Sequence, residues 1–330
     1  MPKIRSLSLM GNQGPHFELL AKGGFEVVLK PEGKNPFVED DLIEMLSDCE
    51  AVIAGSEPYT ARVIEALPEL RHIARSGVGF DAVDLAACDA HEIVVTTTPG
   101  VNHHAVAELA ITMLMSLARG FPGLDRRTRV NDWRRSPLPR VMGSTLGIVG
   151  LGRIGRAVCT RAIGLGMNVL AFEPYPNREF VEQWDVELTE LDDLLRQSDF
   201  VTLHSPSTPE THQLMNTESI AKMKPGSILI NTARGSLIDE TSLMQALQSG
   251  HLRGAGLDVF EVEPPSIDNP LLKMDNVLLS CHVGGLDQTS HHDTFTMVAN
   301  TVLQLYNGGW PSECIINLKN AENWQWGSET

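Results

Sequence analysis

Short apolar runs alternate with helix-like segments along most of this 330-residue chain, and this alternation restricts the folds open to it. In the first hundred residues, apolar runs at 25–29 and 51–54 alternate with helix-like segments at 40–47 and 59–66. Strand-like runs then recur at 146–149, 169–172, 201–203, 228–230, 256–259 and 277–279. Strands that alternate with helices are typical of parallel, doubly wound sheets covered on both faces. We therefore predict an α/β fold, in a chain long enough for two lobes.

The two α/β series are separated by an apolar helix and a polar connection. Residues 105–119 are mostly apolar, which predicts a buried helix that starts near Asn102, a good capping residue. Residues 126–142 contain arginines, prolines and a tryptophan, which predicts an irregular connection.

Composition limits the partners and the compartment. A formal net charge of -16 at pH 7 disfavours non-specific binding to nucleic acid or to anionic membrane lipid. The longest apolar stretch, 109–118, is far shorter than a membrane span, and the N-terminus has no apolar run of signal-peptide length. The five cysteines are scattered without a CxxC pair, which fits a reducing compartment. We expect a cytoplasmic protein.

A glycine-rich turn begins the second α/β series. Gly150, Gly152 and Gly155 have the GxGxxG spacing, between a strand-like run that ends at Val149 and a helical run from Arg153. Such glycines permit a tight turn and let backbone N–H groups approach a pyrophosphate at a helix N-terminus. Glu173 ends the next strand about 20 residues later, where a carboxylate accepts hydrogen bonds from ribose hydroxyls and repels a 2′-phosphate. The motif therefore predicts NAD rather than NADP.

Three chemically distinct side chains follow strand-like runs near the end of the chain. Arg234, Glu263 and His282 are expected at one edge of the sheet, because the carboxyl ends of parallel strands gather there. Reduction of a 2-keto acid needs a cation for the carboxylate, an acid for the carbonyl oxygen, and a partner that keeps this acid charged. Arg234 provides a guanidinium fork, His282 the acid and base, and Glu263 the partner that orients the imidazole ring. An exposed salt bridge beside a buried histidine is the alternative.

Further motifs occur in a consistent order: 74–81 (ARSGVGFD), 150–155 (GLGRIG), 203–206 (LHSP) with Thr211, 231–235 (NTARG), 258–264 (DVFEVEP) and 282–285 (HVGG). With these motifs, the chain resembles the D-isomer-specific 2-hydroxyacid dehydrogenase family from about residue 51 to 318. Within the family, it is most similar to the 3-phosphoglycerate dehydrogenase branch, which acts in serine biosynthesis.

The resemblance implies two Rossmann-like domains, with an NAD-binding domain at 102–294 inserted into a substrate domain formed by 1–101 and 295–330. It implies a homodimer and a catalytic triad of Arg234, Glu263 and His282. It selects Glu263 over Glu261, because Glu263 lies directly before a proline.

The resemblance also implies ligand contacts outside the triad. The amides of Val78 and Gly79 would bind the substrate carboxylate, and Arg75 would meet a distal phosphate. NAD contacts are implied for Arg153, Ile154, Glu173, Ser205, Pro206, Thr211, Thr232, Ala233, Asp258, Gly284 and Gly285.

One departure bears on the substrate. Phosphoglycerate dehydrogenases often carry an arginine in the loop after the strand at 52–53, whereas this chain has Ala54-Gly55-Ser56-Glu57, which weakens the case for a phosphate pocket. No domain-length sequence follows residue 320, so feedback control by a bound amino acid is not expected. Hydroxypyruvate or glyoxylate reduction is the main alternative, followed by other 2-keto acids. A non-enzymatic NAD sensor similar to a transcriptional corepressor is another, whereas formate dehydrogenases place glutamine where Glu263 stands.

Two further features have ordinary interpretations. The pairs His103-His104 and His291-His292 lack a third ligand at suitable spacing, so we expect no metal site. Cys281, beside His282, is expected to be a small buried residue at a strand end rather than a reactive thiol.

Overall fold

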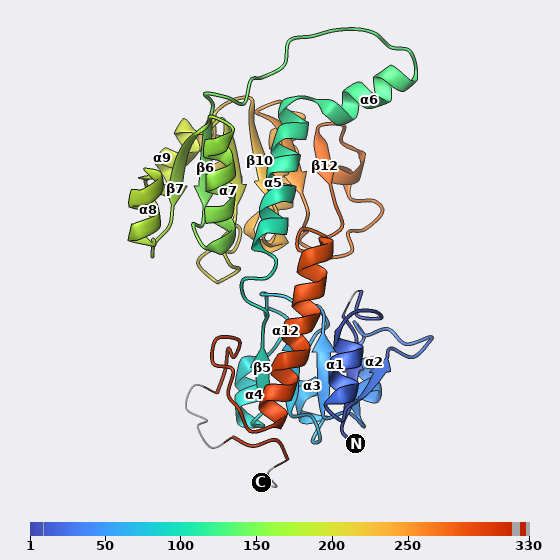
Figure 1. The fold of residues 1–330 in the computed structure, drawn as a ribbon. Helices are drawn as coiled ribbons and strands as arrows, with labels where there is room; N and C mark the ends of the chain where they lie inside the picture. The colour runs from blue at the N-terminus through green and yellow to red at the C-terminus, as the bar shows by residue number, and fades with distance from the viewer. Residues whose placement is uncertain (9, 319–323, 328–330) are drawn as a thin grey trace. The chain divides into compact units, whose positions relative to one another are not determined.

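The computed structural model describes residues 1–330 except residues 9, 319–323 and 328–330. By their contacts, the described residues form two compact units: unit 1 is Met1–Asn102 with Leu286–Thr330, and unit 2 is His103–Gly285. Each unit contains a parallel sheet with helices on its faces (Figure 1), so the predicted α/β fold with two doubly wound sheets is confirmed. The resemblance places the return to the first lobe at about residue 295, whereas the contacts place it at Leu286.

Unit 1 contains a parallel sheet with the strand order β2-β1-β3-β4-β5. Successive side chains of a strand face opposite sides, so Val52 packs with helices α2, α3 and α4, while Ile53 packs with α1 and α12. The strands are β1 (Lys3–Ser6), β2 (Glu26–Leu29), β3 (Ala51–Ala54), β4 (His72–Arg75) and β5 (Val94–Thr96). The helices are α1 (His16–Lys22), α2 (Glu39–Leu46), α3 (Ala61–Glu65), α4 (Leu85–Ala90) and α12 (Gln288–Tyr306).

Unit 2 contains a parallel sheet with the strand order β12-β11-β10-β9-β6-β7-β8. The strands are β6 (Thr145–Val149), β7 (Asn168–Phe172), β8 (Glu187–Leu188), β9 (Phe200–Leu203), β10 (Ser227–Asn231), β11 (Leu252–Leu257) and β12 (Val277–Leu279). The helices are α5 (His103–Ala118), α6 (Phe121–Arg129), α7 (Arg153–Gly164), α8 (Arg178–Trp184), α9 (Leu191–Gln197), α10 (Thr217–Lys222) and α11 (Glu240–Gln248), with 3₁₀ turns η1 (Gly235–Leu237) and η2 (Pro270–Lys273). The strand order reverses direction between β6 and β9, which is where ligands bind in sheets of this type.

Two apolar cores cover the faces of the unit 2 sheet. Leu146 and Ile148 of β6 pack with α5 and α7, which lie on one face in Figure 1. Val149 packs on the other face with residues of α9, α10 and α11. The prediction of a largely buried helix that starts near Asn102 is confirmed by α5, which begins at His103.

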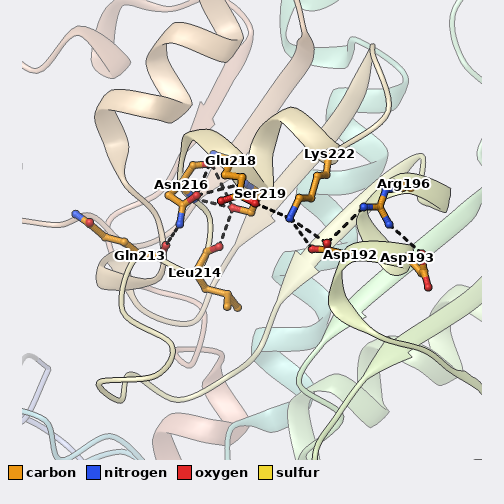
Figure 2. A network of polar contacts seen from close by, with 9 residues as sticks. All are labelled: Asp192, Asp193, Arg196, Gln213, Leu214, Asn216, Glu218, Ser219 and Lys222. Atoms are coloured by element: carbon orange, nitrogen blue, oxygen red, sulfur yellow. Dashed lines mark hydrogen bonds and ion pairs between the residues drawn. The ribbon is translucent and has the colours of Figure 1, made fainter.

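A polar network joins α9 to α10 on the second face (Figure 2). Lys222 contacts Asp192 at 2.9 Å and Glu218 at 3.0 Å. At the start of α10, the Asn216 side chain accepts hydrogen bonds from the Glu218 and Ser219 amides, while Ser219 Oγ accepts one from the Asn216 amide. Such a capping box satisfies N–H groups that the first helical turn leaves unpaired. The network therefore fixes the C-terminal end of the connection between β9 and α10, in which Thr211 lies.

The connection after α5 is partly helical. The prediction of irregular structure from residue 126 is wrong for residues 126–129, because α6 continues to Arg129. An Asp125–Arg129 ion pair of 2.8 Å supports its last turn. Residues 130–142 are irregular, as predicted. Among the described residues, no single helix is long and apolar enough to cross a membrane, and α5 and α6 satisfy that criterion only as a pair bent by 59°.

The described part of the C-terminal tail packs on unit 1. The Trp326 ring lies 5.6 Å from the rings of Phe25 and Tyr306, and its Nε1 donates a hydrogen bond to Glu50. Trp324 Nε1 donates to the Glu92 carbonyl. Trp326 therefore extends a core of unit 1, and Trp324 is tied to the same unit by its hydrogen bond.

A buried histidine links β4 to β5 in the same unit. His72 is fully buried, and its Nε2 lies 2.8 Å from Thr96 Oγ1. Burial lowers the pKa of His72 to about 3. The folded protein therefore holds this ring neutral at pH values where an unfolded chain would protonate it.

Unit 1 should lose stability as the pH falls below the ordinary histidine pKa. Because the folded pKa of His72 is depressed, stability falls with decreasing pH between about 6.5 and 3, by about 2 kcal/mol at about pH 5. Chemical denaturation at about pH 7.5 and 5 should show that His72→Gln loses less stability on acidification than the wild type. The exposed His292→Gln is the control, and equal acid losses for all three proteins would contradict the assignment.

Candidate active site

Polar residues collect at the carboxyl ends of the unit 2 strands. Arg234 follows β10, Asp258 follows β11 and His282 follows β12. The Asn231 side chain accepts a hydrogen bond from the Ala233 amide and donates one to the Arg234 carbonyl, which fixes the turn that presents Arg234. A Cβ on Gly235 would lie 1.9 Å from the Phe260 carbonyl oxygen, so only glycine allows the backbone after Arg234 to approach the loop of Glu263.

His282 and Glu263 form a direct hydrogen bond. His282 Nδ1 lies 2.7 Å from Glu263 Oε2, while Glu263 Oε1 accepts a hydrogen bond from the Phe260 amide at 3.0 Å. Burial of Glu263 opposes its charge, but the hydrogen bond and the attraction of His282 outweigh that effect and lower the pKa of Glu263. An ionised carboxylate can only accept, so Nδ1 donates and Nε2 is left to exchange a proton with a ligand. Glu261 instead accepts a hydrogen bond from the Glu240 amide.

Asp258 holds the loop that presents His282. Its carboxylate is buried and accepts hydrogen bonds from Ser280 Oγ and from the Val283 and Gly284 amides, at 2.5, 2.9 and 2.8 Å. Its carbonyl accepts one from the His282 amide. His282 has a φ of +54°, an uncommon backbone conformation for a residue with a side chain. These bonds stabilise that conformation and thereby the position of the imidazole ring.

The prediction that Cys281 is buried is wrong. The thiol side chain is exposed, because β12 ends at Leu279 and Cys281 already lies in the loop.

The glycine turn after β6 leaves space for a pyrophosphate. A Cβ on Gly155 would lie 2.0 Å from the Gly150 carbonyl oxygen, so α7 packs directly on the turn. Gly150 has a φ of +94°, and its Cβ would lie 2.8 Å from the Ser205 amide nitrogen. A Cβ on Gly152 would meet no atom within 4 Å, at the point where Arg153 begins the helix. The turn therefore combines tight packing on one side with an open cradle at a helix N-terminus, where pyrophosphates bind.

The other residues expected to contact NAD lie at the same carboxyl ends. After β7, Glu173 accepts hydrogen bonds from the Leu151 and Tyr175 amides, at 2.8 and 3.0 Å. After β9, Thr211 Oγ1 donates to the Pro206 carbonyl at 2.7 Å. Thr232 Oγ1 is buried without a hydrogen-bond partner among the described residues. Ile154 lies in the first turn of α7, whereas Ser205, Ala233, Gly284 and Gly285 lie in loops. The fixed carboxylate of Glu173, the hydroxyl of Thr232 without a partner among the described residues, and the open turn at Gly152 together fit NAD.

The residues expected to contact substrate lie in unit 1. Arg75 ends β4, and its Nε donates a hydrogen bond of 2.8 Å to the Gly79 carbonyl in the following loop. The loop that contains Val78 and Gly79 is thus anchored by Arg75. Sequence reasoning noted Glu57 only as part of the segment 54–57 and missed that its carboxylate is buried near the same strand ends. The sequence feature that could have revealed it is an acidic residue three positions after the fully apolar strand β3.

No metal centre is seen within the described residues, where no three His, Cys, Asp or Glu side chains gather in a suitable arrangement. Glu108 instead pairs with Arg161 at 2.9 Å, and the same guanidinium lies 3.4 Å from His104 Nδ1.

Comparisons with known proteins identify the family. The model of the D-isomer specific 2-hydroxyacid dehydrogenase NAD binding domain matches residues 111–284. A glyoxylate reductase of Korarchaeum cryptofilum is 40% identical over 85% of this chain and 86% of its own length. A D-3-phosphoglycerate dehydrogenase of Archaeoglobus fulgidus is 37% identical over 92% of this chain, which spans only 58% of that relative's length.

A solved structure extends the likeness to the fold of nearly the whole chain. The D-lactate dehydrogenase of Aquifex aeolicus, complexed with NAD and lactic acid, has a TM-score of 0.83 at 28% identity, over 93% of this chain and 96% of that one. These matches confirm the predicted resemblance and the predicted cofactor. The chain belongs to the D-isomer specific 2-hydroxyacid dehydrogenase family, whose members are NAD-dependent oxidoreductases.

Proposed function

We propose that this protein interconverts a small 2-hydroxy acid and its 2-keto acid, with His282 as the acid and base. The observation that carries the proposal is the 2.7 Å hydrogen bond between His282 and Glu263, at the sheet edge where the glycine turn also lies. NAD, when bound, accepts or supplies the hydride at carbon 2.

The assigned roles follow from the charges of the side chains. In reduction, His282 Nε2 donates a proton to the carbonyl oxygen, and Glu263 stabilises the charged ring beforehand. In oxidation, the same nitrogen accepts the hydroxyl proton. Arg234 binds the substrate carboxylate as a planar cation.

Phosphorylated and unphosphorylated 2-keto acids should be compared directly, because both a D-3-phosphoglycerate dehydrogenase and a glyoxylate reductase match the chain. A purified enzyme should be assayed with NADH and NADPH on 3-phosphohydroxypyruvate, hydroxypyruvate, glyoxylate, pyruvate and 2-ketobutyrate. Turnover with NADH on any of these acids supports the proposal. Tight NADH binding without turnover on all of them would overturn it and favour an NAD-sensing protein.

His282 and Glu263 should affect catalysis differently. His282→Gln should lower kcat by about 10²- to 10⁴-fold, because proton transfer is lost. Glu263→Gln should lower kcat less than His282→Gln does, because the glutamine oxygen can still accept the Nδ1 hydrogen bond while the negative charge beside the ring is lost. Steady-state kinetics and NADH titrations measure both effects. Full activity of His282→Gln would remove this residue from its role.

A substitution at Gly152 tests the cofactor cradle, because it should affect NADH binding without lowering the stability of the protein. A methyl group at Gly152 meets open space in the protein but occupies the cradle, so Gly152→Ala should weaken NADH binding by about tenfold or more at nearly unchanged Tm. Gly164→Ala, also in open space but at the far end of α7, is the matched control. Equal NADH affinities for the two variants would contradict the assignment.

We also propose a homodimer formed through the segment 121–142. No residue of α6 is buried, and Phe121, Val130 and Trp133 are 65%, 75% and 66% exposed. Figure 1 shows this segment projecting from the sheet of unit 2. Arg135 and Arg140 add positive charge to this segment, whereas the chain as a whole is strongly acidic. An apolar, locally basic segment therefore complements the acidic surface of a second copy.

The double variant Val130→Ser with Trp133→Ser should dissociate the dimer. Sedimentation equilibrium should give a dimer mass for the wild type and a lower mass for the variant, because interface cores depend on buried aromatic anchors. Ile267→Ser, which alters an 81% exposed side chain elsewhere in unit 2, is the control. A monomeric wild type would rule out this assembly.

A further inference from the structure

Glu57 is a buried carboxylate near the carboxyl ends of the unit 1 strands. It follows β3 and is only 2% exposed. Its Oε2 accepts hydrogen bonds from the Gly55 amide at 2.7 Å and from the buried Tyr59 hydroxyl at 3.4 Å. A Cβ on Gly55 would lie 2.7 Å from Glu57 Oε1, so the carboxylate packs closely against its own loop. Its position is therefore well defined.

Glu57 opposes the charge of Arg75. β3 and β4 are adjacent, with Ala54 paired to Arg75, and the positive charge of Arg75 acts directly on the Glu57 carboxylate. Burial raises the pKa of Glu57, and the hydrogen bonds and the charge of Arg75 reduce this rise without reversing it. Arg75 also donates to the Gly79 carbonyl. The guanidinium is thus used to balance Glu57 and to anchor the loop expected to bind the substrate carboxylate.

Apart from Arg75, four of the five loops at these strand ends carry no strong cation, and the fifth, after β2, carries Lys30 and Lys34, of which Lys34 pairs with Asp41 and Glu44. The segments 7–15, 55–60, 76–84 and 97–102, which follow β1, β3, β4 and β5, contain no lysine or arginine, whereas they contain Glu57, Asp81 and Asp84. Uncharged polar groups are present, including the Ser8 and Ser76 hydroxyls, which lie 2.6 Å apart. A phosphate with a charge of about −2 would meet an excess of negative charge on this side.

From these observations, and on the basis of the proposed function, we infer that Glu57 is a specificity residue. By balancing Arg75, it makes unit 1 select short 2-keto acids with an uncharged substituent over phosphorylated ones. It acts through Arg75 and through the local field rather than on the reacting atoms. The test is therefore the ratio of the kcat/KM values for two substrates rather than the rate with one of them.

The experiment compares kcat/KM for 3-phosphohydroxypyruvate with kcat/KM for hydroxypyruvate in the wild type and in Glu57→Gln. Glutamine keeps an acceptor for the Gly55 amide but removes the charge. The wild type should favour hydroxypyruvate, and Glu57→Gln should raise the ratio by about tenfold or more in favour of the phosphorylated acid. Glu65→Gln removes an exposed charge from the nearby helix α3 and should leave the ratio unchanged.

A second variant gives a test that does not alter the buried network. Ser56 is exposed beside Glu57, so Ser56→Arg adds a cation without disturbing the core and should also raise the ratio. A wild type that prefers the phosphorylated acid, or an unchanged ratio in Ser56→Arg or in a folded Glu57→Gln, overturns the inference while leaving the proposed function intact. Absence of turnover on all five acids of the panel would instead overturn the proposed function.

Discussion

The buried carboxylate of Asp258 organises the edge of the sheet on which the candidate catalytic residues lie. A carboxylate at 1% exposure is stable only when its oxygens are satisfied, and here one hydroxyl and two loop amides satisfy them. The same donors belong to the loop that holds His282 in a left-handed conformation. The cost of burying one charge is thus offset by bonds that also define the position of the imidazole ring.

Close backbone contacts provide a second constraint. Gly155 brings α7 onto the turn of Gly150, and Gly235 brings the loop of Arg234 onto that of Glu263. In both places a side chain would overlap with a carbonyl oxygen. Gly155 and Gly235 are therefore needed because they allow two backbone segments to pack closely. Gly152 instead leaves open space for a ligand.

The strands and the order of motifs could be predicted from the sequence, because each motif directly follows an apolar run. The bond between His282 and Glu263 follows from the same reasoning, since parallel strands present their carboxyl ends on one edge. The helical state of residues 126–129 was missed because the stretch is strongly polar and has no apolar periodicity; an exposed Asp125–Arg129 pair adds only modest support. Cys281 was misjudged because it was taken as part of a buried strand end, although the predicted and the observed strand both end at Leu279. The burial of Glu57 was overlooked because carboxylates are seldom buried.

The two-part composition of unit 1 has a consequence for synthesis on the ribosome. Ile4, Phe25 and Ile53 share their core with Phe295 and Val298 of α12, which the ribosome makes only after all of unit 2. Unit 2 is continuous in sequence and can complete its cores first. The N-terminal sheet, although made earliest, therefore keeps one apolar face only partly covered, by α1, until α12 is translated.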